Sequence, residues 1–110
     1  MQYMLLIYGE EGAQESHAAF RSIGDLQAKG TLLASEELQP VATATTVRVR
    51  NGDTVVSDGP FAETEETLGA YCLIEADSLD EAIEWASRIP SARSGTVEIR
   101  PVVDNSEHRE

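Results

Sequence analysis

The chain has 110 residues, which is enough for one domain with a single hydrophobic core. Hydrophobic residues make up 41% and charged residues 25%, a composition that excludes a mainly disordered protein. The 20 acidic and 8 basic side chains give a net charge of −12. A field of that sign repels phosphate groups, so we expect neither nucleic acid nor an anionic membrane as a partner.

Targeting and metal-binding signals are also missing from the sequence. No apolar run approaches the roughly 20 residues of a membrane helix, and residues 1–8 lack the basic start of a signal peptide. Cys72 is the single cysteine, and no Cys and His residues stand at zinc-ligand spacing. We therefore expect a cytoplasmic protein that holds no metal and no cofactor.

The chain begins with a predicted strand, a helix and a second strand. Residues 3–8 are aromatic and aliphatic, which is typical of a buried strand. Apolar residues at helical spacing predict a helix over about 14–29, and Gly30 stands where a helix commonly ends. The apolar stretch from Leu32 predicts a strand that ends near Pro40.

A hairpin is the clearest local signal. Residues 44–50 and 53–57 are rich in β-branched side chains and flank Asn51-Gly52. This pair is preferred in two-residue type I′ turns, because both positions need a positive φ. The turn register places Arg50 opposite Asp53.

The second half predicts a strand, a helix and a last strand. The strand is expected over 68–76, and Ser78 with Glu81 forms a capping box at the start of the helix. Pro90 ends the helix, and the last strand covers about 95–102. The apolar stripe expected to face the core consists of Leu79, Ala82, Ile83, Ala86 and Ile89.

The order of these elements predicts the fold class. A β-α-β unit, a hairpin and a second β-α-β unit predict an α+β domain of the ferredoxin-like plan over residues 1–103, followed by a polar tail over 104–110. Two helices cover one face of the predicted sheet. Because the other face is also apolar, we expect a homodimer joined sheet to sheet.

Several motifs carry a family resemblance. They are Glu36-Glu37-Leu38-Gln39-Pro40, Val56-Ser57-Asp58-Gly59-Pro60-Phe61-Ala62-Glu63-Thr64, Leu68-Gly69-Ala70-Tyr71 and Val97-Glu98-Ile99-Arg100-Pro101-Val102. In this order they resemble the DGPF branch of the YCII-related family, over about residues 1–103. The resemblance implies a ferredoxin-like domain that dimerises into an α/β barrel. Some members are associated with sigma factors, which implies a regulatory protein as a partner, and a distant relative is a dehydrochlorinase.

Asp58 and His17 are the candidate catalytic residues. Asp58 precedes a Gly-Pro turn, where burial would raise the pKa of a carboxyl group and make it a general base. The alternative role for Asp58 is an Asx-type turn cap. His17 lies in the first turn of the predicted helix, as a proton shuttle or as an exposed side chain.

Five further residues are candidates for ligand binding: Glu36, Gln39, Arg48, Phe61 and Tyr71. Each has a structural alternative. Glu36 and Gln39 also suit a solvated strand end, and Arg48 suits cross-strand pairing with an acidic residue. Phe61 suits the core or a dimer interface, and Tyr71 suits packing within a strand.

Two functions follow from these residues. The first is a small homodimeric module that binds a small molecule or a regulatory protein. The second is a lyase- or isomerase-like enzyme that uses Asp58 and His17 as acid and base on a small organic substrate. The first is favoured, because the sequence contains no recognisable catalytic set and fold analogy alone supports the second.

Overall fold

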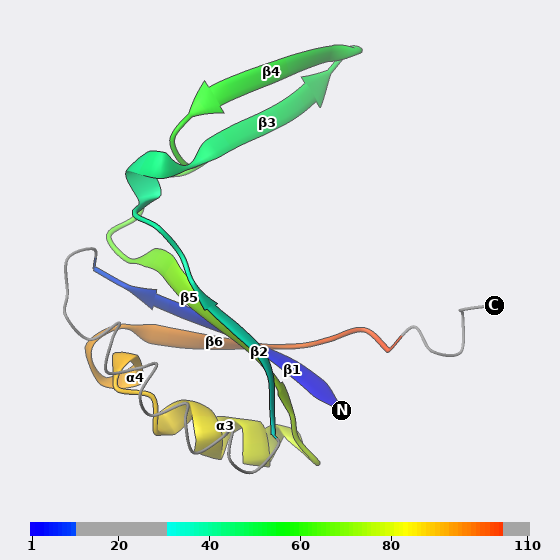
Figure 1. Cartoon of the computed structure of the whole chain (residues 1–110), viewed down its shortest axis with the longest axis vertical. Coiled ribbons are helices and arrows are strands. Elements are labelled where there is room, and N and C mark those ends of the chain that lie inside the picture. The colour runs from blue at the N-terminus through cyan, green and yellow to red at the C-terminus, as the bar shows by residue number, and fades with distance from the viewer. Residues whose placement is uncertain (11–30, 105–110) are drawn as a thin grey trace.

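The structure, a computed structural model, describes residues 1–10 and 31–104, which form an α+β domain with antiparallel sheets (Figure 1). The four-stranded sheet has the order β2-β5-β1-β6, and a separate two-stranded sheet pairs β3 with β4. The strands are β1 (Gln2–Gly9), β2 (Leu32–Glu37), β3 (Thr45–Arg50), β4 (Asp53–Asp58), β5 (Thr67–Glu75) and β6 (Thr96–Pro101). The helices are α3 (Leu79–Ser87), α4 (Ser91–Ser94) and a short 3-10 helix η1 (Val41–Thr43).

The predicted strands and the predicted second helix are confirmed in type and approximate position. The helix predicted over 14–29 lies outside the described residues, as does the tail beyond Asp104. Within the described part of the chain, no helix combines the length and the apolar character needed to cross a bilayer.

The core lies on one face of the four-stranded sheet. Tyr3, Leu5 and Ile7 alternate along β1 and are buried, as the two-residue period of a strand requires. They stand opposite β5 residues that are buried as well. The rest of the core consists of Ala70, Cys72, Ile74, Ala76, Ala82, Ala86 and Ile89. Helices α3 and α4 lie on this side of the sheet (Figure 1).

The opposite face, which we call the open face, carries the remaining residues of the same strands. Met4, Leu6 and Tyr8 of β1 and Tyr71 and Leu73 of β5 are half-buried. They are the residues that alternate with the core positions. The open face is therefore an apolar surface on which part of each side chain stays accessible.

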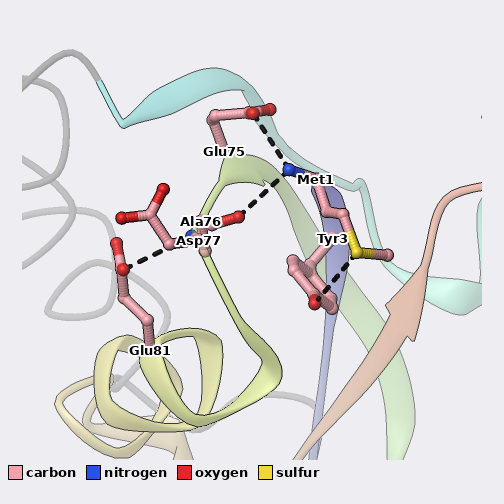
Figure 2. A network of polar contacts seen from close by, with 6 residues as sticks. All are labelled: Met1, Tyr3, Glu75, Ala76, Asp77 and Glu81. Atoms are coloured by element: carbon pink, nitrogen blue, oxygen red, sulfur yellow. Dashed lines mark hydrogen bonds and ion pairs between the residues drawn. The ribbon is translucent and has the colours of Figure 1, made fainter.

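Helix α3 begins at the predicted cap. The Ser78 hydroxyl accepts from the backbone N–H of Glu81 at 3.2 Å. The carboxylate of Glu81 reaches back one residue further than a capping box requires, because it accepts from the backbone N–H of Asp77 at 3.3 Å (Figure 2).

The apolar stripe predicted for α3 is only partly correct. Ala82 and Ala86 are buried, and so is Ile89, which follows the end of α3, whereas Leu79 and Ile83 are about half exposed. The small alanines allow the helix to approach the sheet along a narrow line, and the two larger residues lie at its flank. The helix therefore contributes less buried area than the stripe predicts.

The N-terminal end of β1 is tied to the connection between β5 and α3. The amino group of Met1 lies 3.0 Å from a carboxylate oxygen of Glu75 and donates to the carbonyl of Ala76 at 3.1 Å (Figure 2). The hydroxyl of Tyr3 donates to the sulfur of Met1 at 3.7 Å. Met1 and Glu75 are exposed, so the ion pair contributes little to stability.

The predicted hairpin is confirmed in turn type and register. Asn51 and Gly52 have φ values of 53° and 81°, as a type I′ turn requires. Arg50 stands opposite Asp53. The hairpin projects away from the four-stranded sheet, on the side opposite α3 and α4 (Figure 1).

We predict that Asn51→Pro unpairs the hairpin without unfolding the sheet. Proline fixes φ near −65° and cannot adopt the positive φ of Asn51. Because the core lies outside the hairpin, the four-stranded sheet should stay folded while the amides of β3 and β4 lose protection from hydrogen exchange. Glu65→Ala, a substitution in an exposed loop, is the control and should leave those amides protected. Protected hairpin amides in Asn51→Pro would contradict the turn assignment.

The buried thiol of Cys72 should make stability depend on pH in the alkaline range. Burial raises the pKa of Cys72 from 9.0 to about 11. The neutral thiol therefore makes its full contribution to the free energy of unfolding below pH 9. That contribution is lost as the pH rises from 9 through about 11. Over that window the free energy of unfolding should fall by up to about 1.4 kcal/mol per pH unit. Chemical denaturation of Cys72→Ala should show a shallower decline, and equal slopes would show that the thiol ionises alike in both states.

Candidate functional site

Two of the predicted ligand-binding residues meet on the open face. Glu36 of β2 and Tyr71 of β5 are directly paired across the two strands. Leu6 of β1 pairs with Tyr71 on one side and with Glu98 of β6 on the other. These four residues therefore form one row that crosses all four strands, with a carboxylate near each edge of the sheet.

Tyr8 adds a second hydroxyl beside this row. Its hydroxyl donates to a carboxylate oxygen of Glu98 at 3.2 Å. Partial burial raises the pKa of Tyr8 above its ordinary value, and the negative charge and hydrogen bond of Glu98 raise it further. The other carboxylate oxygen of Glu98 lies 3.7 Å from Arg100. Tyr8 is thus a proton donor held against a carboxylate.

The open-face site comprises Glu36, Tyr71, Leu6, Glu98 and Tyr8. Its carboxylates accept hydrogen bonds, and its tyrosines offer both hydroxyls and flat ring surfaces. Small-molecule sites are lined mainly by apolar side chains with a few polar groups in defined places, and the open face offers this combination of groups. Within the described residues, no group of three or more His, Cys, Asp or Glu is gathered to hold a metal ion.

The hairpin and the turn that follows it place the predicted residues elsewhere. Asp58 ends β4 opposite Thr45 and is exposed. Asp58 would therefore act as a buried acid or base only if a surface outside the described residues covered it. Arg48 is also exposed and stands opposite Val55, whereas its neighbour on the same face, Arg50, stands opposite Asp53.

The turn after Asp58 is anchored to the base of the hairpin. The N–H of Gly59 donates to the carbonyl of Ala44 at 2.7 Å, and the hydroxyl of Thr46 donates to the carbonyl of Gly59 at 2.8 Å. Gly59 has a φ of 96°, a conformation that residues with a side chain rarely adopt. The contacts of Gly59 support the structural role of this turn and leave a catalytic role for Asp58 as a prediction.

The remaining candidates do not join the open-face site in this structure. Phe61 is 80% exposed, so it does not belong to the core of the chain. Gln39 is exposed in the segment between β2 and η1. His17 lies outside the described residues. A ligand-binding role for Phe61 and Gln39 stays a prediction.

Sequence reasoning missed Leu6, Glu98 and Tyr8 as site residues. The two-residue alternation of β1 places Leu6 and Tyr8 on the face opposite the buried positions, and this signal was present in the sequence. No comparable signal pointed to the contact between Tyr8 and Glu98, because this contact depends on the pairing of β1 with β6 across about 90 residues of chain.

We predict that Glu98→Gln lowers the pKa of Tyr8 toward the ordinary value of a tyrosine. The substitution removes the negative charge, while the part of the shift that comes from burial remains. Absorbance of the tyrosinate ion during an alkaline titration measures the change. Glu36→Gln is the matched control, since Glu36 lies two strands away from β1. Equal shifts in both variants would show that Tyr8 senses the general charge of the face rather than Glu98.

Comparisons with known proteins agree with this architecture. A sequence model described as the YCII-related domain matches residues 1–106. An uncharacterized protein of Rhizobium meliloti is 36% identical over 114 residues, covering 93% of this chain and 92% of that protein. The solved structure of 5-chloro-2-hydroxyhydroquinone dehydrochlorinase from Burkholderia phenoliruptrix, in complex with 2,5-dihydroxybenzoquinone, has a TM-score of 0.57. It is 13% identical and covers 100% of both chains, so the likeness concerns the fold.

Proposed function

The chain belongs to the family of YCII-related domains, and on that basis we propose that it is a small homodimeric module that binds an organic molecule at its open face. The observation that carries this proposal is the Tyr8–Glu98 hydrogen bond within a half-buried apolar surface. A ligand that covers this surface also buries the polar pair, and that burial is costly unless the polar groups stay hydrogen-bonded. The site would therefore select a ligand that leaves these hydrogen bonds satisfied.

The chemistry of the site indicates the class of ligand. Glu36 and Glu98 accept hydrogen bonds and repel anions, while the ring of Tyr71 between β2 and β1 offers a flat apolar surface. We therefore propose a flat, uncharged ring that carries hydroxyl groups. The dehydrochlorinase of similar fold, which was solved with a dihydroxybenzoquinone, supports a ring of this size.

The proposed dimer joins two copies through their open faces. The strand order β2-β5-β1-β6 supports a ferredoxin-like arrangement, and two such sheets facing one another would form the dimeric α/β barrel that we propose. The half-buried Met4, Leu6 and Leu73 supply the apolar contact that such packing needs.

Hydroquinone tests the ligand class, and benzoate serves as the anionic control of similar size. We expect hydroquinone, with a dissociation constant on the order of millimolar for so small a ring, to shift the amide resonances of β1, β5 and β6. Benzoate should not shift them, because the carboxylates repel it. Glu98→Gln should weaken hydroquinone binding several-fold, whereas the exposed Glu63→Gln should not. Shifts confined to other parts of the chain would overturn the proposal.

A lyase-like enzyme is the second candidate. Tyr8 and Glu98 form a proton donor and acceptor in contact, and the neighbour of similar fold is named as a dehydrochlorinase. Asp58 and His17 stay the predicted acid and base of this alternative. The two candidates differ in turnover, since only an enzyme would release chloride from 5-chloro-2-hydroxyhydroquinone, the compound in the name of that neighbour.

A further inference from the structure

The hairpin of β3 and β4 has one apolar face, which no described element covers. Cross-strand pairing places Val47 opposite Val56 and Val49 opposite Thr54 on this face, and the pair of Thr45 and Asp58 lies at its end, where the hairpin joins the rest of the chain. Val47 and Val49 are each 59% exposed, and Val56 is 60% exposed. We call Val47, Val49 and Val56 the valine face. The other side of the hairpin pairs Arg48 with Val55 and Arg50 with Asp53.

An isolated two-stranded ribbon is at best marginally stable in water. Two faces of opposite character are typical of a ribbon that is packed on one side and solvated on the other. The hairpin projects from the sheet, so its backbone gains no cover from the core of its own chain (Figure 1). The valine face thus has the character of a surface that packs against a partner.

The position of the hairpin favours a second copy as that partner. The hairpin rises on the open side of the sheet, opposite α3 and α4 (Figure 1). Six-residue strands extend about 20 Å, whereas two sheets packed face to face lie about 10 Å apart. A copy seated on the open face would therefore lie within reach of the hairpin.

The distribution of charge favours the same partner. Residues 45–58 contain two arginines and two aspartates, so the hairpin is neutral in a chain with a net charge of −12. All the excess negative charge lies in the rest of the chain. A second copy, which is also acidic, is therefore repelled less by the hairpin than by the rest of the chain.

We propose that the β3–β4 hairpin is a dimerisation arm whose valine face is buried against a second copy of the chain. This inference rests on the homodimer of the proposed function and adds a second contact to it, separate from the open face. In a two-fold dimer each copy offers one arm and receives the other, so every arm contact occurs twice.

Val56 and Val55 provide a matched test, because they are neighbours on β4 that point to opposite faces. Sedimentation equilibrium should show the dimer dissociation constant of Val56→Lys raised about tenfold or more, since the substitution places a charge in the buried face. Val55→Lys introduces the same charge and the same strand propensity on the solvated face and should change the constant less than about threefold. Equal effects of the two variants would overturn the arm.

Leu6→Lys separates the arm from the proposed open-face dimer. If Leu6→Lys dissociates the dimer while Val56→Lys leaves the dimer dissociation constant unchanged, the arm is overturned and the open-face dimer is retained. Loss of dimer in Val56→Lys with none in Leu6→Lys would leave the arm and overturn the open-face contact. A wild-type chain that is monomeric at every concentration measured would overturn both.

A second measurement needs no variant. Hydrogen exchange at the amides of β3 and β4 should slow as the concentration of the wild-type chain rises, because only the dimer covers the ribbon. Fast exchange that is independent of concentration would show that no second copy covers the hairpin, and it would overturn the proposal.

Discussion

Strand β1 is hydrogen-bonded along both of its edges, to β5 and to β6, and the rest of the domain depends on its register. Its alternating residues direct Tyr3, Leu5 and Ile7 into the core and leave Leu6 and Tyr8 on the open face. A slip of one residue would exchange the two faces, exposing the core and burying polar groups. The core and the open-face site are thus two consequences of one pairing.

A bulge in β5 connects this register to the hairpin. The pairing shifts between Ile7 and Tyr8, so that Gly69 is left without a partner in β1. The carbonyl of Gly69 instead accepts from the backbone N–H of Leu38 at 2.8 Å, in the segment that leads from β2 toward the hairpin. The irregularity in the central sheet therefore helps to set where the chain leaves the sheet for β3.

The open face joins the two proposals physically. A ligand held between Tyr71 and Glu98 and a second copy packed on Leu6 would use the same surface, so binding and association would be linked. An arm that contacts the second copy away from this surface would allow the dimer to persist while the ligand exchanges. In this proposal the sheet would bind the ligand, and the β3–β4 hairpin would hold the two copies together.

The sequence by itself determined the features that short-range chemistry controls. The turn at Asn51-Gly52 and the cap at Ser78 were predictable, because each depends on residues only a few positions apart. The tertiary structure decided which side chains meet. Glu36, Tyr71 and Glu98 come from strands far apart in the chain, and only the pairing of four strands brings them into one row. It also decided that Gly95 must lack a side chain, because a Cβ there would collide with the backbone carbonyl of Tyr8. Local propensity predicts elements, whereas contacts between distant segments depend on the register of the assembled sheet.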